Sequence, residues 1–161
     1  MLASAPILNK IPSMNDNNLL KLYKNGIRAI EKSPTNSQAR EMINAIQAEW
    51  AKRLEAAKRG AYKANTPNIG MLKSLGYSVG NEGVKTSIRR TILDDIMTIN
   101  LPIVGSPAYT LEWGEPNSRQ RYNKLVRTIQ SLIVGARKDI AIEKAVIEWS
   151  EDLDYIKSKF K

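Results

Sequence analysis

Apolar residues recur at steps of three and four along most of the chain, which is the spacing of one face of an α-helix. The first two such segments cover residues 16–32 and about 37 to the low sixties. The polar run at 15–17 and then Asn36 or Ser37 can cap their N-termini. Pro34 separates the two segments, so we expect an antiparallel helical hairpin.

Three more helices are expected in the second half of the chain. One covers about 86–99 and ends before Pro102, and the next begins after Asn117 or Ser118. A phase change near residue 139 precedes a last helix that ends near residue 158. No segment alternates convincingly at period two. The sequence therefore predicts an all-α fold with about five main helices, an N-terminal helical hairpin plus a C-terminal helical bundle.

Glycine and proline interrupt the helical periodicity after the hairpin, at Gly60, Pro67 and Gly70. We expect an arm at 1–15, a helical hairpin at 16–63 and a helical domain at 67–161. Shorter helical turns fit the sequence around 69–75 and 108–113. The hairpin and the helical domain can also pack as one domain.

Composition excludes several classes of function. The chain has no Cys and no His, so zinc fingers, thiol nucleophiles and His-dependent catalysis are excluded. Glu112 and Glu115 are the pair that most resembles a paired-carboxylate catalytic site. Glu115 can equally stabilise the positive N-terminus of the helix that follows it. We expect a non-enzymatic protein with no cofactor and no bound metal.

The chain also lacks the sequence features of a membrane protein. No tract of 18 apolar residues occurs, so we expect no membrane-spanning helix and no membrane partner. The start of the sequence has no basic segment before its few apolar residues, and Pro6 and Pro12 interrupt it. These observations predict a cytoplasmic protein.

Charge is unevenly distributed along the sequence. The chain has 25 Lys and Arg against 16 Asp and Glu, a net charge of +9. Residues 52–138 hold 15 basic and 6 acidic residues, and this difference of nine equals the net charge of the whole chain. Residues 139–154, in contrast, hold six acids and one lysine. A face that keeps one sign of charge is typical of binding to a polyanion.

The helix that begins near Ser118 has the strongest such pattern, because no acid occurs between Pro116 and Asp139. On helical phase, its outward side carries cations mixed with amides, which suit phosphates and base edges. The candidate binding residues here are Arg119, Gln120, Asn123, Lys124 and Arg127. The alternative is that the acidic last helix packs beside these cations and pairs with them.

The stretch GYSVGNEGVKTSIRRTIL, residues 76–93, places three glycines before a basic helix start. It is not a nucleotide-hydrolysing loop, because Val84 separates Gly83 from Lys85 and Ser78 stands where the earlier glycine is needed. A helix N-terminus flanked by cations can still hold one backbone phosphate. The candidate residues are Lys85, Thr86, Ser87, Arg89 and Arg90. Alternatively, Arg90 forms a surface ion pair with Asp94, four residues on.

A third basic cluster lies near the end of the long second helix. Its candidate binding residues are Lys58, Arg59 and Lys63. Tyr62 lies among them, and its ring can either stack on a base or pack as a partial core residue.

The pattern GY-x-VG, RR-x-IL and EWGEP-x-S, followed by two helices, resembles an uncharacterised small bacterial helical module. The resemblance covers most of the chain, but that module brings no established activity. From the charge pattern, our hypothesis is a nucleic-acid-binding protein, with double-stranded DNA favoured over RNA. The alternative is a helical adaptor or regulatory module that binds a protein partner, or forms a homodimer, through the N-terminal hairpin.

Overall fold

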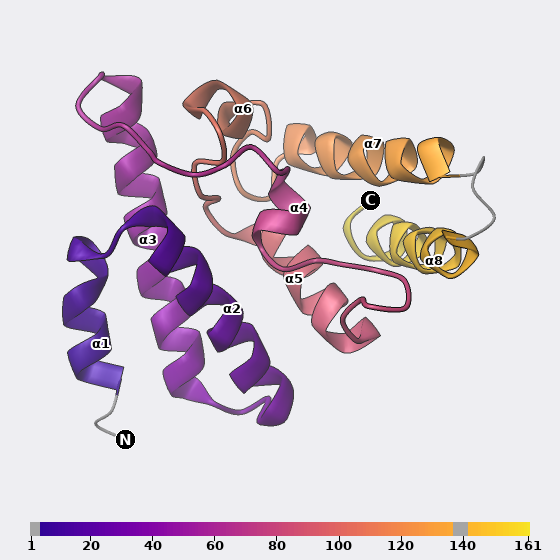
Figure 1. Cartoon of the computed structure of the whole chain (residues 1–161), viewed down its shortest axis with the longest axis horizontal. Helices are drawn as coiled ribbons and strands as arrows, with labels where there is room; N and C mark the ends of the chain where they lie inside the picture. Colours follow the sequence, from indigo (N-terminus) through magenta and orange to yellow (C-terminus); the bar gives the residue numbers. More distant parts are fainter. Residues whose placement is uncertain (1–3, 137–141) are drawn as a thin grey trace. The chain divides into compact units, whose positions relative to one another are not determined.

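The computed structural model describes residues 4–136 and 142–161 of the chain (Figure 1). These residues form eight α-helices, so the all-α class is confirmed but the expected number of about five is too low. In chain order, they are α1 (Ser4–Lys10), α2 (Asp16–Lys32), α3 (Ser37–Lys58), α4 (Met71–Ser74), α5 (Thr86–Thr98), α6 (Pro107–Leu111), α7 (Arg119–Ala136) and α8 (Glu143–Phe160). In the described part of the chain, none of these helices combines the length and the hydropathy needed to cross a bilayer.

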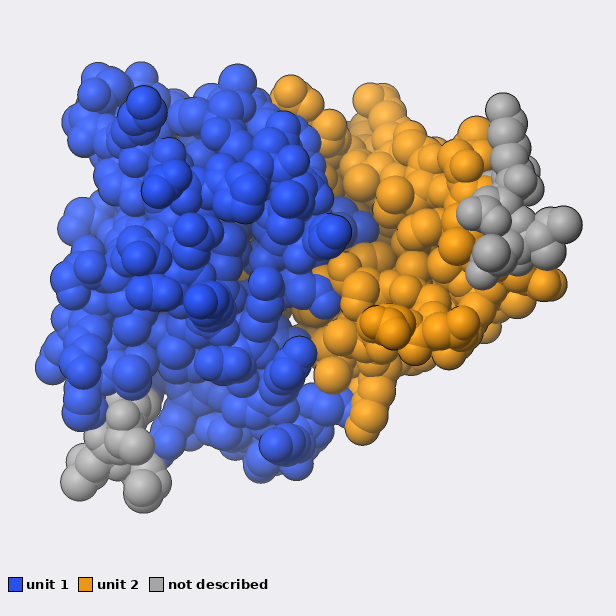
Figure 2. Space-filling model, in the orientation of Figure 1, with its two compact units in different colours: residues 1–76, 100–111 blue, residues 77–99, 112–161 orange. Residues whose placement is uncertain are grey.

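The chain divides into two compact units (Figure 2). Unit 1 comprises residues 1–76 and 100–111, and unit 2 comprises residues 77–99 and 112–161. Each unit is therefore built from two separate segments of the sequence. This division differs from the ranges expected from the sequence, because residues 100–111 return to the unit that contains the hairpin.

Unit 1 is built on the predicted hairpin of α2 and α3, which pack side by side (Figure 1). The side chain of Asn15 caps α2 by accepting a hydrogen bond from the backbone N–H of Asn18 at 2.7 Å. Asn36 caps α3 in the same way, 3.0 Å from the N–H of Ala39. The apolar faces of both helices are buried inside this unit, with residues that include Leu19, Tyr23, Ile27, Ile43, Ile46 and Trp50.

Residues 4–13, within the arm expected at 1–15, pack against the rest of unit 1. Residues 4–13 form α1 and a short 3-10 helix, Ile11–Ser13, and α1 packs against α3. The side chain of Ile11 is buried, which fixes the segment to the core of unit 1. Periodicity does not reveal α1, because a helix of seven residues shows the pattern for only two turns.

Unit 2 consists of α5, α7 and α8, and each of these helices packs against the other two. Apolar side chains at helical spacing meet between them and form its core, which includes Ile92, Leu93, Ile96, Leu125, Ile129 and Ile156. The predicted phase change near residue 139 lies outside the described residues.

Candidate nucleic-acid interface

The five candidate residues on α7 line one open hollow in unit 2 with a volume of about 570 Å³. We call Arg119, Gln120, Asn123, Lys124 and Arg127 the α7 face. Glu112, from the segment that leads to α7, completes the lining. The residues come together because successive exposed positions of a helix recur every three or four residues along one side.

Charge in this hollow is mostly positive. The Nζ atom of Lys124 lies 3.1 Å from a carboxylate oxygen of Glu112, whose side chain is 59% exposed. An exposed ion pair of this kind contributes little to stability. Arg119 and Arg127 are exposed and form no ion pair with any residue in 4–136 or 142–161.

One alternative from the sequence was that the acidic last helix neutralises α7. In the described part of α8, the acids at 148 and 152 instead bind Arg89 of α5. Neither Arg119 nor Arg127 has a carboxylate partner on the described part of α8. The exposed cations of the α7 face are therefore available to an external anion.

Arg89 was expected to contact phosphate, and the structure contradicts this. Its side chain is 1% exposed, with Nε 2.7 Å from Asp152 and an Nη atom 3.1 Å from Glu148. Burial alone would lower the pKa of Arg89, but the hydrogen bonds and charges of these carboxylates outweigh that effect and raise it. The guanidinium also donates to the carbonyl of Val84 at 3.1 Å, so it holds the glycine-containing loop.

The loop itself is bound to α8 by hydrogen bonds. The hydroxyl of Tyr77 donates to Asp152 at 2.6 Å, and the backbone N–H of Gly80 donates to Glu148 at 2.7 Å. Burial, with the neighbouring charge of Asp152, raises the pKa of Tyr77, so its hydroxyl stays protonated and can donate. At Arg89 and in the loop before α5, the carboxylates of α8 thus take the place that the sequence suggested for a phosphate.

Arg90 is partly exposed, but its predicted ion pair with Asp94 is absent from the described residues. The guanidinium of Arg90 lies 4.7 Å from the centre of the Tyr155 ring. Asp94 instead accepts hydrogen bonds from Tyr155 at 2.8 Å and from Lys159 at 2.9 Å. Arg90 therefore packs on an aromatic ring of α8, and only part of it can face a ligand.

The remaining candidates fall into two groups. Lys85, Thr86 and Ser87 are exposed at the start of α5 in unit 2, where an anion can reach them. The exposed cluster of Lys58, Arg59 and Lys63 belongs to unit 1, and Lys58 pairs with Glu55 at 3.0 Å. The structure thus assigns the candidates to different units.

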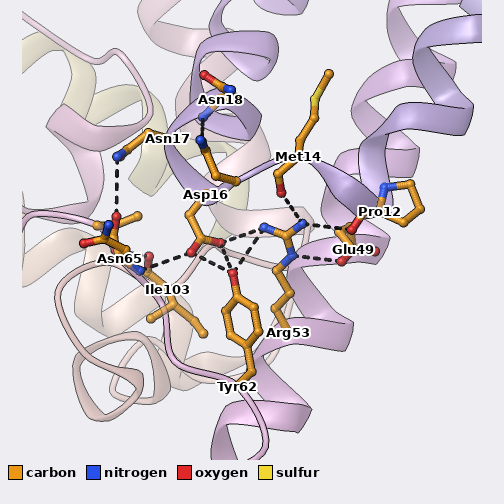
Figure 3. Close-up of polar contacts among 12 residues, drawn as sticks. Pro12, Met14, Asp16, Asn17, Asn18, Glu49, Arg53, Tyr62, Asn65 and Ile103 are labelled. Atoms are coloured by element: carbon orange, nitrogen blue, oxygen red, sulfur yellow. Dashed lines mark hydrogen bonds and ion pairs between the residues drawn. The ribbon is translucent and has the colours of Figure 1, made fainter.

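Beside that cluster, Arg53 and Tyr62 belong to a buried polar network (Figure 3). Arg53 bonds to the carboxylates of Asp16 and Glu49, each at 2.8 Å, and to the carbonyl of Met14 at 2.6 Å. The Tyr62 hydroxyl lies 2.8 Å from the Asp16 carboxylate. Burial and this carboxylate raise the pKa of Tyr62, so its hydroxyl remains a donor at neutral pH. Tyr62 is thus held by the core of unit 1.

The Tyr62→Phe variant should lose about 1.5–3 kcal/mol of unfolding free energy, since it removes a hydrogen bond to a charged acceptor. Urea denaturation followed by circular dichroism measures this loss. The ring remains in the variant, so base stacking would be preserved and DNA affinity should not change. Unchanged stability would contradict the role of Tyr62 in this network.

The candidate interface is thus defined by geometry and charge, with the α7 face at its centre. The resemblance to a bacterial helical module stays a prediction. Comparisons of the chain with protein-family models, with curated proteins and with solved structures give no match.

Proposed function

We propose that the chain is a non-enzymatic nucleic-acid-binding protein of the cytoplasm that binds double-stranded DNA through the α7 face. The observation that carries this proposal is the joint placement of Arg119, Arg127 and Lys124 in one open hollow. Phosphates of a nucleic acid are the polyanion that such an arrangement suits, because each cation can displace a condensed counterion.

The side chains around the hollow favour a duplex over a single strand. Single strands are typically held by bases stacked on aromatic rings, and no aromatic side chain lines the described hollow. Asn123, between the two arginines, has an amide that can bind an adenine edge. The major groove of B-form DNA admits an α-helix, whereas that of A-form RNA is too narrow, so DNA is favoured.

The Arg119→Gln/Arg127→Gln double variant tests this proposal. Each lost phosphate contact should reduce the slope of log affinity against log salt concentration by about 0.9, so the expected reduction is about 1.8. Fluorescence anisotropy with a short duplex of mixed sequence, titrated at several salt concentrations, measures this slope. Glu112→Gln provides a control in the same hollow, since removing its negative charge should strengthen binding.

Two results would refute the proposal. One is failure of the wild-type chain to bind duplex DNA or RNA at low salt. The other is an unchanged affinity and slope in the double variant. Tighter binding to single-stranded than to duplex DNA would be consistent with the α7 face as the binding surface but would contradict double-stranded DNA as its ligand.

The adaptor hypothesis has one supporting observation, although not at its predicted surface. The apolar face of the hairpin is buried inside unit 1, so it offers no free docking site there. In unit 2, Val134 and Ile147 are 63% and 52% exposed, which is unusual for large apolar side chains. A complex or dimer that persists at high salt and is lost in Val134→Ser/Ile147→Ser would favour this alternative.

A further inference from the structure

The outward face of α2 carries only cations and amides. At 100° per residue, seven polar side chains fall within an arc of about 120° opposite the apolar side of the helix. These residues, which we call the α2 face, are Asn17, Asn18, Lys21, Lys24, Asn25, Arg28 and Lys32. All are exposed except Lys24, which is half-buried. The excess of positive charge along the sequence lies in residues 52–138, so this face is revealed only by helical phase.

No acid neutralises the α2 face within the described residues. Asp16 points inward and binds Arg53 at 2.8 Å, and the half-buried Glu31 lies about 20° beyond the edge of the arc and pairs with none of its cations. The four cations form no ion pair with any residue in the described ranges. Four positive charges therefore remain together on one side of a single helix.

We infer that the α2 face is a second surface for the DNA backbone, located on unit 1. This inference rests on the proposed function, because it assigns the same ligand to a separate part of the chain. From Lys21 to Lys32 the helix extends about 17 Å, a length over which one DNA strand carries about five phosphates. Asn18 and Asn25 add hydrogen-bond donors among the cations, the mixture that also characterises the α7 face.

The burial pattern favours nucleic acid over an anionic membrane. An amphipathic helix binds a bilayer by inserting its apolar side between the lipids. On α2 that side is packed inside the unit, with Leu19 and Tyr23 both 0% exposed and Ile27 2% exposed. Only the polar side is available, and phosphates along a rigid duplex match it without any apolar insertion.

The Lys21→Gln/Arg28→Gln/Lys32→Gln triple variant tests the inference with the same duplex and salt titration. Loss of three phosphate contacts should lower the slope by about 2.7 and weaken affinity at low salt. The matched control Lys73→Gln/Lys144→Gln/Lys157→Gln removes the same charge from exposed positions outside both faces. We expect this control to change the slope by less than about 0.9, the contribution of one phosphate contact.

The outcomes separate this inference from the proposed function. If the α7 variant weakens binding and the α2 triple variant behaves like its control, the inference fails and the proposed function stands. If only the α2 variant weakens binding, the proposed role of the α7 face fails. Loss of sedimentation with phosphatidylserine vesicles in the α2 variant, with DNA binding unchanged, would assign the face to a membrane and overturn the inference.

Thermal unfolding followed by circular dichroism checks that the triple variant is folded. If it is not, the single variants Lys21→Gln and Arg28→Gln replace it, and each should lower the slope by about 0.9. An unchanged slope in both folded single variants would also overturn the inference.

Discussion

The Arg89→Met variant is expected to lose about 3–5 kcal/mol of unfolding free energy, because it breaks a buried ion pair by removing one partner. Asp152 is 0% exposed, and the Nε atom of Arg89 lies 2.7 Å from it. After the substitution, Tyr77 is the one remaining side chain of the described residues that donates a hydrogen bond to this carboxylate. The Nε atom of Arg90 lies 3.9 Å from Asp152 but forms no hydrogen bond with it, so the buried carboxylate loses its hydrogen-bonded cation, which is costly in a medium of low polarity.

Chemical denaturation of the purified chain measures this loss, with Lys85→Met as a matched control. Lys85 is an exposed cation four residues earlier in the same stretch, so its replacement should change stability by less than about 0.5 kcal/mol. A double-mutant cycle with Asp152→Leu should show strong coupling between the two residues. If Arg89→Met weakened DNA binding and left stability unchanged, Arg89 would be a surface ligand after all.

The long helices could be predicted because several independent signals agree at each of them. Polar caps at Asn15 and Asn36 mark two starts, and apolar periodicity extends over four or more turns. The short helix α1 gives too few turns for periodicity to identify it, whereas α4 and α6 lie where short helical turns were expected. The return of residues 100–111 to unit 1 depends on long-range packing, which a single sequence does not reveal.

For the site, helical phase proved more informative than charge. Arg53, Arg89 and Arg121 were all counted among the basic residues, yet their exposed fractions are 6%, 1% and 2%. Each lies three or four residues from a core position on its own helix, namely Trp50, Ile92 and Leu125. Such spacing places a cation on the buried side, whereas the residues of the α7 face fall on the opposite side.

The partners of these buried arginines could not be predicted. Asp16 lies 37 residues from Arg53, and Asp152 lies 63 residues from Arg89. Nothing in the local sequence selects one carboxylate at such a distance over another. Asp152 does lie four residues before the buried Ile156, so its own phase marks it as a buried acid that needs a partner.

Replacing Arg121 by Met should lower the unfolding free energy by about 2–4 kcal/mol, for a different reason. Its guanidinium donates to four backbone carbonyls, those of Ile96, Ile99 at 2.9 Å, Gly114 at 2.8 Å and Trp113 at 3.1 Å. These bonds join the end of α5 to the segment that precedes α7. Met cannot donate hydrogen bonds, so the buried carbonyls would lose their partner.

One effect opposes this loss. Burial lowers the pKa of Arg121 to about 10, so the side chain remains charged at neutral pH but at an energetic cost. Removing the charge recovers that cost, so the expected loss is smaller than four broken hydrogen bonds would suggest. Arg121→Lys should also lower the unfolding free energy, because one ammonium group cannot reproduce the planar N–H donors with which the guanidinium reaches four carbonyls.

Arg119 provides the matched control, since it lies two residues earlier in the same basic run and is exposed. Arg119→Met should change the unfolding free energy by less than about 0.5 kcal/mol and should weaken DNA binding. Arg121→Met should lower the unfolding free energy and, at temperatures where the variant remains folded, should leave DNA binding unchanged. Urea denaturation and DNA titration of both variants distinguish these roles.

Equal effects of the two substitutions on stability would contradict the burial of Arg121, and equal effects on affinity would contradict the assignment of the α7 face. Helical phase, which places these two arginines about 160° apart around the helix axis, is thus the physical basis of both expected results.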